Sequence, residues 1–278
     1  MKKEIKVGIC QLAGEASKPA NLAKAEIMLR QAAASGCRLL ILPEMFNCPY
    51  STQAFPDFAE AYPAGETIAM LAQTARSTKT VIVGGSIPER GDDGQLYNTS
   101  FIFDDRGQLI GRHRKIHLLD VELSGGTAFQ ESATLSAGRE ITVIKRPELT
   151  FGVAICYDIR FPELARLMVD RGAKLLIYPA AFSPTTGPAH WQLLMRARAV
   201  DNQVFVIGAA PAKNPAAAYQ AYGHSLAVDP WGEILREADD RETLLTVTLD
   251  LARVAAVRRQ LPLLKHRRPA VYGKWWDR

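Results

Sequence analysis

Residues 150–162, TFGVAICYDIRFP, decide the fold of this chain. The apolar run at 151–155 predicts a buried strand of a parallel sheet. Pro162 opens the helical pattern that follows, as a proline in the first turn does. Cys156 therefore lies at a strand-to-helix turn, at the edge of a sheet where the nucleophiles of α/β enzymes are found. Most free cysteines are small buried hydrophobic residues, so the rest of the chain has to decide between the two interpretations.

Strand-like and helix-like patterns alternate on both sides of this stretch. The apolar periodicities predict strands at 5–10, 38–43, 80–83, 96–103, 108–114, 141–144, 150–155, 174–178, 203–208, 225–228 and 243–249. They predict helices at 21–35, 66–77, 162–171 and 190–202, and a last one that Asp250 caps and that runs to residue 260. This order predicts an α/β fold with two mixed sheets packed face to face and helices outside, a four-layer α-β-β-α sandwich. We expect a single domain over residues 1–278, with 262–278 as a C-terminal arm.

Composition and charge narrow the class of protein. Hydrophobic residues make up 47% of the chain and charged residues 23%, as in ordinary soluble globular proteins. The four cysteines form no CxxC pair, which favours reduced thiols and a cytoplasmic protein. Much of the net charge of +5 lies in residues 253–268. No nucleic-acid-binding signature accompanies this basic run, so a solvated or subunit-facing arm is favoured over a nucleic-acid site. We expect neither nucleic acid nor a membrane as a partner.

Three polar residues follow apolar strand-like runs, and their chemistry is complementary. Glu44 follows the run at 39–43, Lys115 ends the run at 110–115, and Cys156 ends the run in the deciding stretch. A thiol needs a base to become a nucleophile, and a glutamate with a raised pKa can accept its proton. Attack on an amide carbonyl builds an oxyanion that an ammonium and backbone N–H groups can stabilise. Each residue alone has an innocent explanation, but three at strand ends indicate a converging site.

These residues lie in motifs that resemble the Glu, Lys and Cys signatures of the nitrilase superfamily of carbon–nitrogen hydrolases: LPE at 42–44, RKIH at 114–117 and AICYD at 154–158. Within it, several segments are similar to the omega-amidase branch, namely LPEMFNCPY, FQES, CYDIRFPELA, TTGPAHWQLLMRARAVDNQV and VDPWGEIL. The resemblance covers essentially the whole chain. It implies two sheets between two helical layers, a homodimer or higher homo-oligomer, no cofactor and no metal.

The resemblance also implies roles for particular residues. Glu44 is expected to be the general base, Lys115 the cation that stabilises the oxyanion and Cys156 the nucleophile. Glu131 matches a second family glutamate that positions the lysine and the incoming water.

Three further residues are predicted to bind substrate. The backbone N–H of Tyr157 is expected as a second oxyanion donor. Arg160 is expected to bind a substrate carboxylate, although a salt bridge to Asp158 or Glu163 is an alternative. Tyr50 resembles a residue that lines the pocket in this branch.

The implied activity is hydrolysis of the side-chain amide of 2-oxoglutaramate or 2-oxosuccinamate through a thioester. Two alternatives remain open. One is an amidase for deaminated glutathione or another small aliphatic amide with the same three catalytic residues. The other is a catalytically idle binding scaffold, and the presence of Glu44, Lys115 and Cys156 argues against it.

Overall fold

The computed structural model describes residues 4–123 and 127–276. In these residues the strands form a seven-stranded sheet, a six-stranded sheet and a separate two-stranded hairpin. The first sheet has the order β15 (Thr243–Asp250), β1 (Glu4–Gln11), β2 (Leu39–Ile41), β3 (Val81–Val83), β5 (Leu96–Phe103) and β4 (Ile87–Arg90), with β6 (Leu109–Arg114) also paired to β5. The second has the order β14 (Ile234–Glu237), β13 (Leu226–Val228), β12 (Phe205–Ala209), β11 (Leu175–Pro179), β10 (Thr150–Val153) and β9 (Thr142–Lys145). Both sheets are mixed, as predicted: β1, β2 and β3 run parallel, as do β10, β11 and β12.

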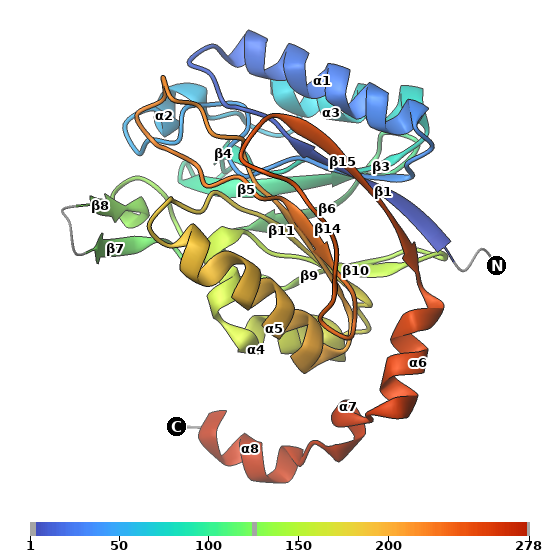
Figure 1. Cartoon of the computed structure of the whole chain (residues 1–278). Helices are drawn as coiled ribbons and strands as arrows, with labels where there is room; N and C mark the ends of the chain where they lie inside the picture. Colours follow the sequence, from blue (N-terminus) through green and yellow to red (C-terminus); the bar gives the residue numbers. More distant parts are fainter. Residues whose placement is uncertain (1–3, 124–126, 277–278) are drawn as a thin grey trace.

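Helices cover the outer face of each sheet. In the described residues the longer helices are α1 (Lys18–Ala34), α3 (Glu66–Thr78), α4 (Pro162–Asp170), α5 (Gln192–Asn202) and α6 (Ala252–Gln260), and the others are α2 (Phe55–Phe58), α7 (Leu263–His266) and α8 (Pro269–Trp276). Figure 1 shows α1 and α3 over one sheet and α4 and α5 over the other. Pro162 lies in the first turn of α4, as expected from the sequence. The predicted four-layer α-β-β-α sandwich is confirmed.

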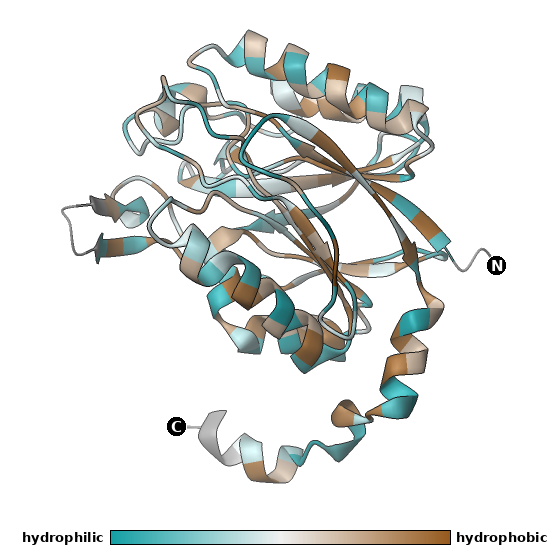
Figure 2. Ribbon diagram, in the orientation of Figure 1, coloured by the Kyte–Doolittle hydropathy of each residue, from teal (hydrophilic) through white to brown (hydrophobic). Residues whose placement is uncertain are grey.

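Three apolar clusters separate these four layers. Alternating residues of β2 and of the position after it show this arrangement: Leu39 and Ile41 belong to the cluster between the sheets, whereas Leu40 and Leu42 belong to the cluster under α1 and α3. This alternation follows from the two-residue period of a strand that is buried on both faces. In Figure 2 brown and pale segments are common in the strands between the helical layers, while the helices alternate brown and teal.

Several short elements were not predicted. They are α2, α7, α8, β4, β14 and the hairpin of β7 (Asp120–Leu123) and β8 (Thr127–Gln130). β4 contains Pro88, which argues against a strand except at a sheet edge, and β4 is an edge strand. The helix predicted from residue 190 begins instead at Gln192, after a π-helical turn at Gly187–Trp191.

The C-terminal helices α6, α7 and α8 leave the sheets and extend past the ends of α4 and α5 (Figure 1). Asp250 accepts a hydrogen bond from the backbone N–H of Ala252 at the start of α6, 3.0 Å away. Within the described residues, no helix combines the length and the apolar character that crossing a bilayer requires.

Candidate active site

The three predicted site residues come together between the ends of strands from both sheets. Glu44 follows β2, Lys115 directly follows β6, and Cys156 follows β10. All three are almost completely buried, with exposed fractions of 1%, 0% and 4% respectively. The sequence prediction that strand ends from distant parts of the chain converge therefore agrees with the geometry.

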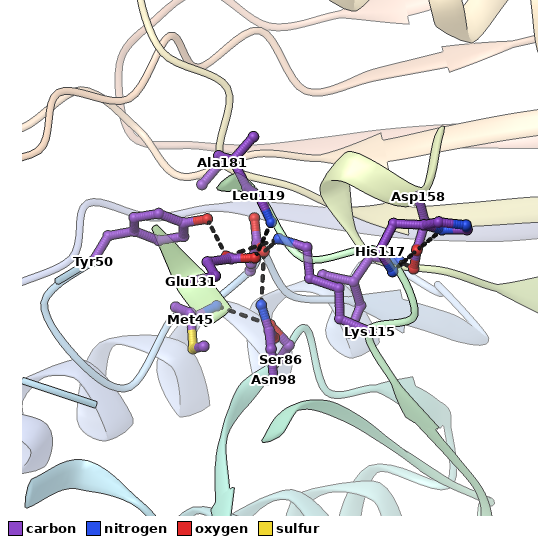
Figure 3. A network of polar contacts seen from close by, with 12 residues as sticks. Met45, Tyr50, Ser86, Asn98, Lys115, His117, Leu119, Glu131, Asp158 and Ala181 are labelled. Carbon is purple, nitrogen blue, oxygen red and sulfur yellow. Dashed lines mark hydrogen bonds and ion pairs between the residues drawn. The ribbon is translucent and has the colours of Figure 1, made fainter. Parts of the chain in front are cut away.

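The Lys115 ammonium lies between two carboxylates (Figure 3). Its Nζ donates to Glu44 Oε1 at 3.0 Å and to Glu131 Oε1 at 2.8 Å. Asn98 Nδ2 also donates to Glu44 Oε1, at 2.8 Å. Among the described residues Glu44 Oε2 has no hydrogen-bond partner. One oxygen of Glu44 is therefore fixed, and the other is free to accept a proton.

The backbone is in an unusual conformation at Cys156 and next to Glu44. Cys156 has a φ of 47°, and Met45, which follows Glu44, has a φ of 50°. Residues with a side chain rarely adopt this left-handed region, and holding one there costs about 1–3 kcal/mol. The conformation at Cys156 is that of a nucleophile on a sharp strand-to-helix turn. Gly85 supports the Glu44 loop, because a Cβ there would lie 2.1 Å from the Pro43 carbonyl oxygen.

Burial and the neighbouring charges set the protonation states. Burial raises the pKa of Glu44, and the positive charge of Lys115 opposes this shift without cancelling it. Burial and the negative charge of Glu44 raise the pKa of the Cys156 thiol well above its usual range. Burial alone would lower the pKa of Lys115, but Glu131 and Glu44 hold it well above the usual value. The raised pKa values keep the Cys156 thiol neutral and Lys115 positively charged, while Glu44 holds its proton to a higher pH than an exposed glutamate does.

A cavity of about 270 Å³ lies beside Cys156. Its walls include the aromatic residues Phe129, Phe182 and Tyr219 and the polar residues Arg160, Ser183, Thr186 and His190. A second cavity, of about 650 Å³, is lined by Glu44 and Tyr50, and Tyr219 lines both. The first volume is slightly below the usual range for ligand pockets, about 300–1,000 Å³, and suits a small molecule.

The residues predicted to bind substrate have different surroundings. Tyr157 and Arg160 both line the cavity beside Cys156. Arg160 Nη1 lies 3.2 Å from His190 Nδ1, and in the described part of the chain it forms no ion pair with Asp158 or Glu163. The guanidinium lies over the rings of Tyr157 and Phe182.

Tyr50 lines a different cavity from Arg160. Its hydroxyl donates to Glu131 Oε1 at 3.1 Å. Tyr50 lines the cavity next to Glu44 rather than the one next to Cys156. A role in substrate binding remains a prediction for Tyr50, as it does for Tyr157 and Arg160.

Some residues of the site were missed in the sequence. Asn98 holds Glu44, Tyr219 lines both cavities, and the backbone N–H of Ala181 faces the Cys156 sulfur and lowers the pKa of the thiol. Asn98 lies inside a strand, and Ala181 acts through its backbone, so neither leaves a signal in a single sequence. Tyr219 lies in a segment without regular periodicity.

Fold, site and sequence comparison agree on the class of protein. A family model described as carbon-nitrogen hydrolase matches residues 6–259. This chain belongs to the carbon–nitrogen hydrolase family, and it is a hydrolase acting on carbon–nitrogen bonds.

The relatives with more specific similarity include two omega-amidases and one solved structure. The omega-amidase NIT2 of Mus musculus is 47% identical over 267 residues, which cover 96% of each chain. The omega-amidase NIT2 of Danio rerio is 45% identical over 270 residues, 97% of each chain. The crystal structure of Saccharomyces cerevisiae Nit3, a member of branch 10 of the nitrilase superfamily, superposes with a TM-score of 0.89 at 43% identity. That match covers 95% of this chain and 97% of the yeast chain.

Proposed function

We propose that this chain is a cysteine-dependent omega-amidase. It hydrolyses the side-chain amide of small 2-oxo dicarboxylic acid monoamides, 2-oxoglutaramate and 2-oxosuccinamate, to the acid and ammonia. The observation that carries the proposal is the placement of Cys156 between the Glu44–Lys115 pair and a small cavity lined by Arg160. The full-length similarity to proteins named omega-amidase supports the substrate class.

In the first half of the reaction the amide bond is broken. Glu44 accepts the thiol proton through its free oxygen as Cys156 attacks the amide carbon. The oxyanion is stabilised by Lys115 Nζ and by the backbone N–H of Tyr157. Glu44 then passes the proton to the nitrogen, ammonia leaves, and the acyl group remains on sulfur as a thioester.

In the second half of the reaction water hydrolyses the thioester. Glu44 takes a proton from the water, whose oxygen attacks the acyl carbon, and the proton returns to the Cys156 sulfur as the acid leaves. Glu131 acts as a positioning residue: Lys115 and Tyr50 donate to its Oε1, and the backbone N–H of Leu119 donates to Oε2 at 2.8 Å. These contacts occupy both oxygens, which supports a role in orienting Lys115.

Ammonia release measured against a panel of amides tests the substrate assignment. The panel contains 2-oxoglutaramate, 2-oxosuccinamate, deaminated glutathione and a neutral aliphatic amide. We expect the highest kcat/KM for a 2-oxo acid amide, because the cavity beside Cys156 is small and Arg160 supplies a cation in its wall. A preference for deaminated glutathione or for the neutral amide would overturn the substrate assignment and leave the amidase chemistry in place.

Arg160→Ala is expected to raise KM for 2-oxoglutaramate by about 10²-fold, since a charge-assisted hydrogen bond to a carboxylate contributes about 1.5–3 kcal/mol. KM for the neutral aliphatic amide is the internal control and should change little. Steady-state kinetics on both substrates decide the matter. Equal increases in KM would show that Arg160 does not bind the carboxylate.

The activity is expected to rise with pH as Glu44 ionises. Since burial raises the pKa of Glu44, the acid limb of kcat/KM should lie above the pH of about 4.3 at which an unperturbed glutamate titrates. The raised pKa of Cys156 keeps the thiol protonated, so a plateau should continue through neutral pH. A pH–rate profile measures both features. A rate that begins to rise only in the alkaline range would indicate direct ionisation of the thiol instead.

We further propose a homodimer of single-domain subunits, with residues 262–278 as an arm. Large apolar side chains are exposed together on α5 and on the turn next to it: Leu193, Val200 and Trp231. Gly232, which follows Trp231, lies against Val200, and Leu193 and Val200 are seven residues apart on one face of α5. Patches of this kind mark protein interfaces. Light scattering that gives the mass of one chain would contradict the dimer.

The four unpaired cysteines support a cytoplasmic location, which cell fractionation tests.

A further inference from the structure

The Asp158 carboxylate is completely buried beside the site and is saturated with hydrogen bonds. Its Oδ1 accepts from the backbone N–H of His117 at 2.9 Å and lies 2.7 Å from His117 Nδ1. Its Oδ2 accepts from the backbone N–H of Ile155 at 2.9 Å and lies 3.2 Å from His113 Nε2. These four contacts hold the Asp158 side chain in one position and orientation.

The partners of this carboxylate belong to two chain segments that carry the proposed nucleophile and cation. The two histidines lie two residues before and two residues after Lys115, and Ile155 directly precedes Cys156. β6 and β10, which lead to these segments, belong to different sheets. In the part of the chain that the structure describes, each hydrogen bond between segments 113–117 and 155–161 ends on Asp158. Figure 3 shows Asp158 and His117 next to each other beside Lys115.

The protonation of this cluster follows from its contacts. Burial alone would raise the pKa of Asp158, but the hydrogen bonds from His113 and His117 hold it well below its usual range. An ionised carboxylate only accepts, so His117 Nδ1 and His113 Nε2 each carry a hydrogen. The His117 ring also stacks on Phe161, with centroids 3.5 Å apart and planes 8° apart. The contact with Asp158 and the stacking on Phe161 therefore fix the orientation of the His117 ring.

The other hydrogen bonds of Lys115 do not reach the segment that carries Cys156. Its Nζ is held by Glu44 and Glu131, and its backbone N–H donates to the Asn98 carbonyl oxygen at 2.8 Å. The Lys115 carbonyl oxygen accepts from the backbone N–H of Gly138. All of these partners precede β10 in the chain, and each lies outside the segment that carries the nucleophile.

We propose that Asp158 is a positioning residue that sets the placement of the Lys115 ammonium relative to the Cys156 sulfur. It joins the two sheets at the point where the oxyanion forms. It also closes the turn that holds Cys156 in its left-handed conformation, because the Asp158 backbone N–H donates to the Ile155 carbonyl oxygen at 2.9 Å. The inference rests on the proposed roles of Lys115 and Cys156.

Asp158→Asn tests the inference. The Asn side chain has the shape of Asp158 but turns one acceptor into a donor that faces N–H groups. We expect kcat for 2-oxoglutaramate to fall by about 10²-fold, the size of losing one oxyanion donor, with KM within about threefold of wild type. The unchanged KM is expected because the substrate tail contacts Arg160 in the cavity rather than Asp158.

Asp229→Asn is the matched control. Asp229 is also buried, and its Oδ1 accepts from the backbone N–H groups of Trp231 and Glu233 while Oδ2 accepts from Arg253. It lies outside the site, so its variant should lose thermal stability without losing kcat. Equal kcat losses in the two variants, or a KM that rises as kcat falls, would overturn the positioning role.

A second variant covers the case in which Asp158→Asn does not fold. His117→Ala removes one of the four hydrogen bonds at a side chain that is partly exposed. We expect about a 10-fold loss of kcat with KM unchanged, roughly a tenth of the effect of a lost donor. A kcat equal to that of wild type would contradict the proposal.

The pH dependence of Cys156 alkylation by iodoacetamide separates this inference from the proposed function. Lys115 lowers the pKa of the thiol, so a displaced Lys115 should move the alkylation midpoint to higher pH in Asp158→Asn or His117→Ala. If the wild-type protein released no ammonia from any amide of the panel, the proposed function would fail. The shift in the midpoint would still support the positioning role, and an unchanged midpoint would overturn it.

Discussion

Cys156→Ala is expected to abolish ammonia release from 2-oxoglutaramate, with a loss in kcat on the order of 10⁵–10⁶-fold, as for the nucleophile of other acyl-transfer enzymes. Without sulfur no thioester can form, and Glu44 has no thiol to deprotonate. The change removes one atom from a side chain that is 4% exposed and lines a cavity, so the fold should persist. Ammonia release and thermal unfolding, followed on the same preparation, measure both effects.

Cys10→Ala is the matched control for this variant. Cys10 is also fully buried but faces α1 rather than the site, and its variant should keep wild-type kcat. Appreciable turnover by Cys156→Ala, or equal losses in the two variants, would show that another group attacks the amide.

Glu44→Gln is expected to lower kcat by about 10³–10⁴-fold, at the upper end of the range for removing a general base. The glutamine oxygen can still accept from Asn98 and Lys115 in place of Oε1. The amide nitrogen then replaces the free oxygen and cannot accept the thiol proton. Single-turnover kinetics should show the loss in the step that forms the thioester.

Glu60→Gln serves as the control for Glu44→Gln. Glu60 is a buried carboxylate that accepts from the Thr67 backbone and hydroxyl and pairs with Lys18. Its variant should change stability more than kcat. A Glu44→Gln variant within tenfold of wild type would assign the base to another group.

Much of the fold could be predicted because most of its strands are buried on both faces. Continuous apolar runs such as that of β10 identify strands that lie between two packed layers, and Pro162 marks the start of the helix that follows. β4 was missed because Pro88 suppresses the strand pattern, and only the edge position in the assembled sheet accommodates it.

The site could be predicted only in part, because a local sequence pattern indicates burial but not the contacts between distant segments. Residues at strand ends, such as Lys115, stand out because they interrupt an apolar pattern. Asp158 lies in the signature around Cys156, but its partners His113 and His117 are more than 40 positions away in the chain. Contacts of this kind depend on how the two sheets pack, which no local pattern encodes.

The central claim is that a carboxylate, an ammonium and a sulfur act on one acyl carbon. A crystal structure of Cys156→Ala with bound 2-oxoglutaramate tests it most directly. We expect the amide carbon next to position 156, the carbonyl oxygen within hydrogen-bond distance of Lys115 Nζ, the amide nitrogen near Glu44 Oε2 and the carboxylate on Arg160. An amide group that lies out of reach of Lys115 or Glu44, with the substrate fully occupied, would contradict it.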